Sequence, residues 1–187
     1  NIPKKVILCE VGMRDGLQNE CKQLTTDEKV ELINLISEAG YPIVEVGSFV
    51  SPKAVPQMAD TDEVFKRITR NPNTEYRALV VNTRGVDRAI ECGCTKIKLN
   101  VSASRAHNLS NLNCTPEETV SRFSEAVEKA KLNKIGVSGS ISMPFGSPWE
   151  SEILVEDVKK IIEAYLACGV KEISLSDTSG MANPLQV

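Results

Sequence analysis

The sequence has no surplus of basic charge. It carries 22 Lys and Arg against 25 Asp and Glu residues, so its formal net charge is −3, and aromatic residues make up only 4% of the chain. Nucleic-acid-binding domains usually show a basic patch, and no cluster of Lys and Arg with interleaved aromatic residues is present. No apolar run approaches the roughly 20 residues that a membrane-spanning helix needs. These absences predict a protein that has neither a nucleic-acid nor a membrane partner.

The cysteines do not form the pattern of a disulfide framework or of a zinc site. There are six in 187 residues, whereas disulfide-built domains are small and dense in cysteine. Cys92-Gly93-Cys94 lacks a second matching pair, so zinc is not expected. We expect free thiols that are buried or partly buried and a reducing compartment. The first residues show neither an initiator Met nor a signal-peptide pattern.

What the sequence does contain is an unbroken alternation of helix and strand patterns, which is typical of a parallel α/β fold. The helix signals include capping boxes at Thr25 with Glu28 and at Thr115 with Glu118, and glycines that follow helix ends. The predicted helices are Thr25 to Ala39, Asp60 to Arg70, Thr83 to Cys92, one that begins at Thr115 and continues through Ala130, and Glu152 to Cys168. The predicted strands are Val6 to Val11, Ile43 to Val46, Tyr76 to Val81, Lys96 to Val101, Val137 to Ile141 and Glu172 to Leu175.

Polar residues recur inside these apolar strands. Alternation puts Lys96, Lys98 and Asn100 on one strand face, and Glu10 and Glu45 each lie within an apolar strand. An ionised group that is buried without a partner is costly, so these charges need partners. In a barrel, alternate strand positions converge on a common interior, whereas both faces of an open doubly wound sheet meet helices. We therefore predict a (β/α)8 TIM barrel rather than the open sheet.

The length predicts an incomplete barrel. A complete (β/α)8 barrel usually needs about 250 residues, and this chain of 187 residues shows six strand patterns. Its last residues, from Asn183, have the pattern of a helix N-cap and first turn. No linker or low-complexity segment divides the chain. We expect residues 1–187 to be the N-terminal three-quarters of one barrel domain, with about six of the eight β/α units.

The turn after the first predicted strand concentrates charge. Arg14 and Asp15 lie next to each other and ahead of Gly16, at the carboxyl end of a strand, where α/β proteins place ligand sites. A cation beside an anion could hold a metal ion and a polarised oxygen side by side. The alternative is a surface turn in which both side chains are solvated.

The same segment carries a family resemblance. Residues 10–20, Glu-Val-Gly-Met-Arg-Asp-Gly-Leu-Gln-Asn-Glu, are similar to the first-strand motif of 3-hydroxy-3-methylglutaryl-CoA lyases. Further matches follow in the family's order over nearly the whole chain, at residues 48–53, 55–60, 102–104, 111–114 and 172–178. The Arg-Asp-Gly core alone is shared with related metal-dependent Claisen-type synthases (isopropylmalate, homocitrate and citramalate synthases). Leu17 to Glu20 and Ser48 to Lys53 favour the lyases.

The resemblance implies a retro-Claisen cleavage of a 3-hydroxyacyl-CoA, which for the hydroxymethylglutaryl substrate gives acetyl-CoA and acetoacetate. It also implies Mg2+ or Mn2+, an acyl-CoA substrate, and a cytoplasmic location in a bacterium or the mitochondrial matrix in a eukaryote. Asp15 matches the family's metal-ligand Asp, and the other ligands are expected beyond Val187. We therefore expect this chain to be inactive alone. A Claisen-type synthase is the alternative enzyme, and a non-catalytic half-barrel that pairs with another chain is the alternative outside enzymes.

The resemblance and the chemistry together suggest three catalytic residues. Arg14 is a permanent cation that suits the oxygen where negative charge develops. Glu45 is expected to pair with Arg14 and hold its rotamer. The alternative is that Glu45 has a purely structural role, in an ion pair with a lysine inside the barrel. Asp177 matches an active-site acid of the family, for proton transfer or for orienting Thr178, and its alternative role is to cap the following turn.

The remaining expectations concern the substrate and the surface. Gln18, Ser48 and Thr178 are the expected substrate contacts, with surface-turn roles as the alternative for the two hydroxyl residues. His107 is the only histidine and is expected to be solvent-exposed in a polar loop. Trp149 departs from the family's Gly-Cys-Pro-Tyr-Glu pattern, as does Ser147, and both put the identity of the substrate in question. Open strand edges predict a homodimer or another association through those edges.

Overall fold

A computed structural model of the protein describes residues 3–150 and 152–187. Six strands are hydrogen-bonded in the order β1-β2-β3-β4-β5-β6, and the pairs β1–β2, β2–β3 and β5–β6 are parallel. The strands are β1 (Cys9–Glu10), β2 (Ile43–Ser48), β3 (Glu75–Val80), β4 (Lys96–Ser102), β5 (Gly136–Ser142) and β6 (Ile173–Ser176).

Helices occupy the connections between these strands. They are the π-helix η1 (Gly12–Gly16), α1 (Thr26–Glu38), the 3-10 helix η2 (Pro56–Met58), α2 (Thr61–Arg67), α3 (Thr83–Glu91), α4 (Arg105–Leu112), α5 (Pro116–Ser121), α6 (Phe123–Leu132) and α7 (Val155–Ala167). A doubly wound sheet reverses its strand order at a switch point, whereas these strands neighbour one another in chain order, as in a (β/α)8 barrel. The predicted fold, an incomplete barrel with six strands, is confirmed.

The chain forms two compact units. Unit 1 comprises Asn1–Ile97 with Lys134–Gly136, and unit 2 comprises Lys98–Asn133 with Val137–Val187. The sequence-based expectation of a single domain stays a prediction, and each unit is described by itself. None of the helices in the described part of the chain has the length and apolar character that spanning a bilayer demands.

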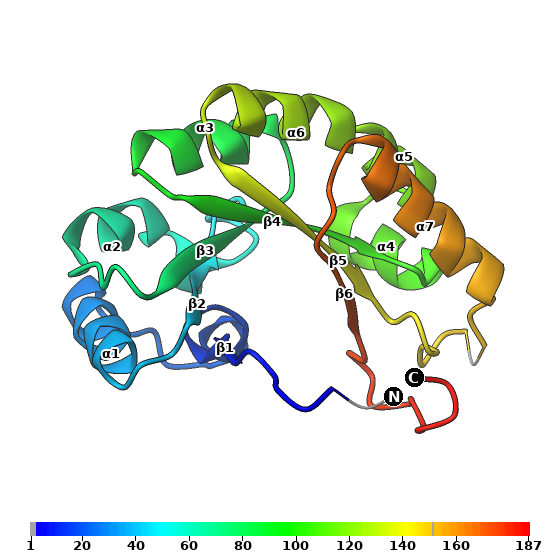
Figure 1. The fold of residues 1–187 in the computed structure, drawn as a ribbon, viewed down its shortest axis with the longest axis horizontal. Coiled ribbons are helices and arrows are strands. Elements are labelled where there is room, and N and C mark those ends of the chain that lie inside the picture. The colour runs from blue at the N-terminus through cyan, green and yellow to red at the C-terminus, as the bar shows by residue number, and fades with distance from the viewer. Residues whose placement is uncertain (1–2, 151) are drawn as a thin grey trace. The chain divides into compact units, whose positions relative to one another are not determined.

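Unit 1 is built on β2 and β3, with α1 and α2 packed beside β2 (Figure 1). Its core contains the fully buried Ile33 of α1 and Val44 of β2, and the rings of Phe49 and Phe65 stack with their centroids 5.8 Å apart. Helix α1 begins where expected, because Thr25 and Glu28 form both hydrogen bonds of a capping box. The pairing of β2 with β3 shifts register between Glu45 and Gly47.

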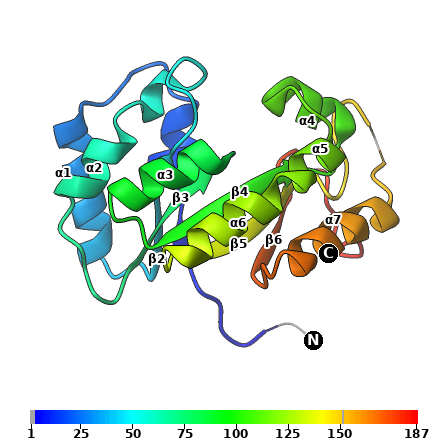
Figure 2. The ribbon, with the colours of Figure 1, turned by 90° about the horizontal axis from the view of Figure 1, so that it is seen from above.

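Unit 2 is organised around Tyr165 of α7, whose side chain is fully buried. Its ring stacks on Phe123 of α6 with the centroids 4.7 Å apart, and its hydroxyl donates to the carbonyl oxygens of Leu99, at 2.9 Å, and Ser140, at 3.1 Å. These contacts bring α6 and α7 onto the same side of β4 and β5, and Figure 2 shows α6 running along β5. Gly139 leaves room for the ring, since a Cβ atom there would lie 2.9 Å from it.

Four expectations about local structure are corrected. The first strand is only Cys9–Glu10, and Val6, Ile7 and Leu8 before it are largely exposed. The turn that follows is a π-helix. The segment after β4 is the helix α4. Ser104 is its N-cap residue, because the Ser104 side chain accepts a hydrogen bond from the His107 amide. The helix predicted from Thr115 is interrupted at Arg122, which separates α5 from α6.

The six cysteines form no disulfide bond with one another, as the sequence predicts, but the expectation that they are buried or partly buried is wrong for Cys9 and Cys21. Cys92, Cys94 and Cys114 are buried, Cys168 is half-buried, and Cys9 and Cys21 are exposed. Burial raises the pKa of Cys92 to about 11 and that of Cys94 to about 12. The Cys94 thiol also donates to the carbonyl of Lys96 at 3.1 Å. The buried thiols are therefore unreactive structural groups.

These pKa shifts predict selective labelling. At pH 8, a thiol reagent such as DTNB should react with Cys21 of the natural protein that contains this sequence at least about 100-fold faster than with Cys92 and Cys94, because the buried pair stays protonated and shielded. Mass spectrometry of labelled peptides would measure the rates. Equal labelling of Cys21 and the buried pair in the folded protein would contradict the structure.

The position of Tyr165 predicts a specific loss of stability. Tyr165→Phe keeps the ring but removes the donor to two buried carbonyls, so the free energy of unfolding in urea should fall by about 1–3 kcal/mol. Tyr41→Phe is the matched control, because the Tyr41 hydroxyl makes no hydrogen bond to another described residue, and it should change stability by less than about 0.5 kcal/mol. A Tyr165→Phe variant as stable as this control would show that the bonds do not matter.

Candidate functional site

The turn after β1 holds two of the predicted site residues in one compact π-helix. The backbone N–H groups of Arg14 and Asp15 both donate to the carbonyl oxygen of Val11, at 3.1 and 2.7 Å. Met13 is buried, with 5% of its surface exposed, so this apolar side chain anchors the turn in the core. Single π-helical turns are rare and occur frequently at functional sites. The turn fixes Arg14 and Asp15 beside each other at the carboxyl end of the strand.

Arg14 is held by carboxylates on two sides. Its Nε donates to Oε1 of Glu45, and its Nη1 donates to Oδ1 of Asp15 at 2.7 Å. The Glu45 side chain is completely buried and that of Arg14 is 12% exposed, so this is an ion pair largely removed from water. The pairing of Glu45 with Arg14 that the sequence suggested is confirmed. The guanidinium group keeps its Nη2 donors without a protein partner among the described residues.

Glu45 lies within a charged face of the strands of unit 1. The β2–β3 register puts Arg77 directly beside Glu45, and Arg77 donates to Oε1 of Glu75. Lys96 reaches the other oxygen of Glu75 at 3.2 Å. Charges of opposite sign therefore alternate across neighbouring strands, which meets the requirement that buried charges have partners. Glu45, Arg77 and Lys96 each have a further interaction beyond these.

Asp15 is the expected metal ligand, and its carboxylate is accessible. Its side chain is 57% exposed, and one of its two oxygens accepts from Arg14. Hard divalent cations prefer several oxygen ligands around them. Within residues 3–150 and 152–187, no group of three or more His, Cys, Asp or Glu side chains could hold a metal ion. The described residues thus offer one suitable oxygen ligand and do not form a metal site by themselves.

The two predicted substrate contacts of unit 1 differ in their surroundings. Ser48 ends β2 and is completely buried, yet its hydroxyl oxygen has no hydrogen-bond partner in the described part of the chain. An unpaired buried hydroxyl is unusual and costly, and a ligand that supplies the missing partner removes that cost. Gln18 follows the π-helix, is half-buried, and makes no side-chain hydrogen bond that the structure shows among these residues.

Asp177 and Thr178 lie in unit 2, directly after β6, and both are exposed. The Asp177 carboxylate accepts hydrogen bonds from the amides of Met181, at 3.0 Å, and Ala182, at 3.2 Å. This is the turn-capping role that the sequence left open as its alternative. Thr178 donates its hydroxyl to the carbonyl of Ser176 at 3.2 Å, so it is also engaged locally.

Unit 2 also has a polar strand face. Ser142 of β5 donates its hydroxyl to Oδ1 of Asn100 on β4 at 3.0 Å, and the hydroxyls of Ser140 and Ser176 lie 3.2 Å apart. The alternation of polar residues seen in the sequence therefore corresponds to hydrogen bonds between neighbouring strands. Within each unit, polar side chains meet on one face of the strands. Apolar residues are covered by α1 and α2 in unit 1 and by α6 and α7 in unit 2.

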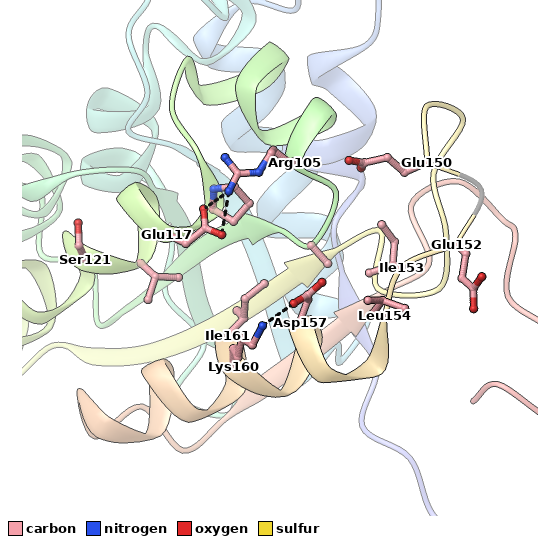
Figure 3. A pocket seen from close by; sticks show the side chains of 13 residues that line it. Arg105, Glu117, Ser121, Glu150, Glu152, Ile153, Leu154, Asp157, Lys160 and Ile161 are labelled. Atoms are coloured by element: carbon pink, nitrogen blue, oxygen red, sulfur yellow. Dashed lines mark hydrogen bonds and ion pairs between the residues drawn. The ribbon is translucent and has the colours of Figure 1, made fainter.

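A cavity in unit 2 was not predicted from the sequence. It has a volume of about 730 Å³ and is lined by both apolar and charged side chains (Figure 3). Two ion pairs border it: Arg105 with Glu117, at 3.0 Å, and Lys160 with Asp157, at 2.8 Å. Glu150 also lines it, and its buried Oε2 has no hydrogen-bond partner among the described residues. None of the sequence-predicted site residues lines this cavity.

His107 is not the solvent-exposed residue expected from the sequence. Its ring stacks on Trp149 with the centroids 5.7 Å apart, it is half-buried, and its Nδ1 is buried without a partner in the described part of the chain. Burial lowers the pKa of His107 below its ordinary value. The expectation failed because the segment after β4 folds as a helix against the loop that follows β5.

The chain is similar to known proteins in both sequence and structure. The sequence pattern of the family described as HMGL-like matches residues 5–187. The chain is 39% identical over 183 residues to the mitochondrial hydroxymethylglutaryl-CoA lyase of Rattus norvegicus, covering 98% of this chain and 56% of that protein. It is 40% identical over 181 residues to a 3-hydroxy-3-isohexenylglutaryl-CoA/hydroxymethylglutaryl-CoA lyase of Pseudomonas aeruginosa, covering 97% and 60%.

A solved structure shows the same fold. The HMG-CoA lyase of Acinetobacter baumannii, in complex with coenzyme A and 3-methylmalate, superposes with a TM-score of 0.93 at 42% identity. The alignment covers 96% of this chain and 59% of that one. The chain therefore spans a little over half the length of the relatives it matches, and its six strands correspond to part of a larger barrel.

The buried ion pair predicts a measurable cost when its charge is removed. Glu45→Gln retains shape but replaces a charged acceptor of Arg14, so the free energy of unfolding of the natural protein should fall by about 1.5–3 kcal/mol in urea. Glu38→Gln, on the exposed end of α1, should change it by less than about 0.5 kcal/mol. Equal stability of the two variants would contradict the role of Glu45.

Proposed function

Because the chain belongs to the HMGL-like family, we propose that the natural protein containing it cleaves 3-hydroxy-3-methylglutaryl-CoA, or a related 3-hydroxyacyl-CoA, to acetyl-CoA and acetoacetate or the corresponding keto acid. The observation that carries this proposal is the arrangement at the end of β1. A permanent cation, Arg14, is fixed by a buried carboxylate and lies against the accessible carboxylate of Asp15. This arrangement suits a reaction in which negative charge develops on an oxygen atom.

The reaction breaks the bond between the carbon that carries the tertiary hydroxyl and the carbon next to the thioester. The hydroxyl loses its proton and becomes the ketone, while the electron pair of the broken bond moves to the thioester as an enolate, which is then protonated to acetyl-CoA. Arg14 is the proposed donor to the oxygen that gains charge, through the Nη2 hydrogens, which no residue in the described part of the chain accepts. A preorganised donor at such a position contributes about 10²–10³ in rate.

Glu45 holds the Arg14 side chain in one orientation before substrate arrives. The guanidinium is fixed at Nε and Nη1, so little ordering remains to be done during the reaction. Ser48 and Gln18 are the proposed substrate contacts in unit 1, and the unpaired Ser48 hydroxyl supports this role. Asp177 is proposed to accept or deliver a proton and Thr178 to contact substrate, both from the end of β6.

Asp15 is proposed as one ligand of a divalent cation, Mg2+ or Mn2+. Its exposed carboxylate has the hard oxygen donors that these ions prefer. Since the described residues contain no group of three candidate ligands, the remaining ligands are proposed to come from residues beyond Val187. When bound, such a cation acts as a Lewis acid that lowers the pKa of a hydroxyl group it contacts. Arg14 keeps Asp15 oriented through the 2.7 Å contact.

Location and association are further proposals. The relatives include proteins named as mitochondrial and as cytoplasmic, so the cytoplasm or the mitochondrial matrix is the proposed compartment. The exposed apolar segment Val6, Ile7 and Leu8, with 68%, 71% and 59% of their surfaces accessible, supports association through the edge at β1, with a second copy or with further strands.

The activity predicts a direct assay. The full-length natural protein that contains this sequence, supplied with Mn2+ and 3-hydroxy-3-methylglutaryl-CoA, should release acetoacetate. Arg14→Met should lower kcat per folded molecule by about 10²–10³-fold, and it should also lower stability because it leaves the buried Glu45 without its cation. The 187-residue chain alone should show no turnover, because one carboxylate does not bind a cation tightly.

Two outcomes would overturn this assignment. Condensation of acetyl-CoA with a 2-oxo acid by the full-length protein, without cleavage activity, would assign it to the Claisen-type synthases. Full activity of Arg14→Met would remove Arg14 from the reaction.

A further inference from the structure

We propose that Glu10 is a positioning residue for Arg14 and Asp15, acting through the amide of Gly12. The inference deepens the proposed function and rests on it for its kinetic test. Glu10 is the last residue of β1 and lies opposite Val44 in the register with β2. It is not among the residues that bind or transform the substrate in the proposed reaction.

The contact between Glu10 and Gly12 fixes the start of the π-helix. Oε1 of Glu10 accepts a hydrogen bond from the Gly12 N–H at 2.5 Å. The amides of Arg14 and Asp15 donate to the carbonyl of Val11. The first N–H groups of any helix have no partner within it, and no other side chain caps this one. Glu10 therefore supplies the partner that the turn itself lacks, and an anion at that end is also favourable.

Gly12 is required by the same contact. A Cβ atom at this position would lie 2.7 Å from Oε1 of Glu10, and, apart from the adjacent residues and the backbone of the turn itself, the only other described atom within 4 Å is Cδ of Glu10. The backbone of Gly12 is not in the left-handed region, so an alanine would fit the chain conformation itself. A side chain at position 12 would collide with the Glu10 carboxyl group and displace it, so the Glu10–Gly12 contact needs both residues.

The Glu10–Gly12 contact acts on the reaction through Arg14. The guanidinium must reach Glu45 on the neighbouring strand and Asp15 in its own turn at the same time. Both contacts depend on where the turn begins relative to β1, because the turn is short and its amides converge on the single carbonyl of Val11. Misplacement of a reacting group by about 1 Å can cost about 100-fold in rate. Loss of the Glu10 contact should thus reduce kcat rather than substrate affinity.

The test is a double-mutant cycle in the full-length natural protein. Glu10→Ala and Gly12→Ala should each lower kcat for 3-hydroxy-3-methylglutaryl-CoA by about 10–100-fold, with KM changed less than about threefold. The double variant should be no worse than the more damaged single variant, because both changes break one contact. Glu10→Gln keeps an oxygen acceptor for Gly12 and should retain kcat within about threefold. Glu31→Ala, at an exposed site on α1, is the control for removing a carboxylate and should have no effect.

The kinetic outcomes separate this role from a merely structural one. Multiplied effects in the double variant, a loss confined to KM, or Glu10→Gln as damaged as Glu10→Ala would each overturn the proposal. The Arg14 Nε–H resonance in a 15N-labelled sample gives a readout that does not need activity. It should shift in Glu10→Ala and Gly12→Ala and stay in place in Glu10→Gln. An inactive wild-type protein would refute the proposed function, while an unmoved resonance in all variants would refute the positioning role.

Discussion

The buried ion pair between Arg14 and Glu45 is the interaction on which the rest of the site depends. Glu45 has no exposed surface, and a carboxylate in that position is tolerated only because a cation and a neighbouring charged strand face compensate it. The pair joins the turn after β1 to β2, so the position of the charged turn is fixed relative to the neighbouring strand. Because Nε and Nη1 of Arg14 are each bonded to a carboxylate oxygen, the guanidinium group is held in one orientation. That preorganisation is what converts a charged turn into a candidate active site.

Much of the fold could be predicted because its signals are local. The capping boxes at Thr25 and Thr115 begin helices as expected, and Gly40, Gly93 and Gly169 all adopt positive φ after helix ends. The polar residues within apolar strands correctly indicated faces that need partners. The motif resemblance supplied the family. The requirement that a buried charge be compensated predicted that Glu45 has a cationic partner, but left Arg14 and a lysine inside the barrel as alternatives, and the structure shows the pair with Arg14.

The remainder depends on tertiary context, which short patterns do not encode. The segment around His107 is rich in Asn and Ser, and this composition predicts a loop rather than a helix. Helix α4 forms there because Ser104 caps it and because the buried Asn108 donates hydrogen bonds to Cys114 and Thr119. No residue preference signals a π-helix, and that of residues 12–16 forms because several amides converge on one carbonyl. For Asp177 the family pattern and the observed capping bonds point to different roles. The cavity beside α7 involves residues up to 58 positions apart, from Ala103 to Ile161, and has no local signal.

The central claim is that Arg14, oriented by Glu45, faces the oxygen on which charge develops, beside a cation held in part by Asp15. The most direct measurement is a crystal structure of the full-length natural protein with Mn2+ and a non-cleavable 3-hydroxyacyl-CoA analogue. The account predicts Arg14 within hydrogen-bond distance of an oxygen of the analogue, with its Nε still on Glu45 and Asp15 bound to the metal ion. An analogue bound elsewhere, with Arg14 turned away from it and Asp15 off the metal, would contradict the account.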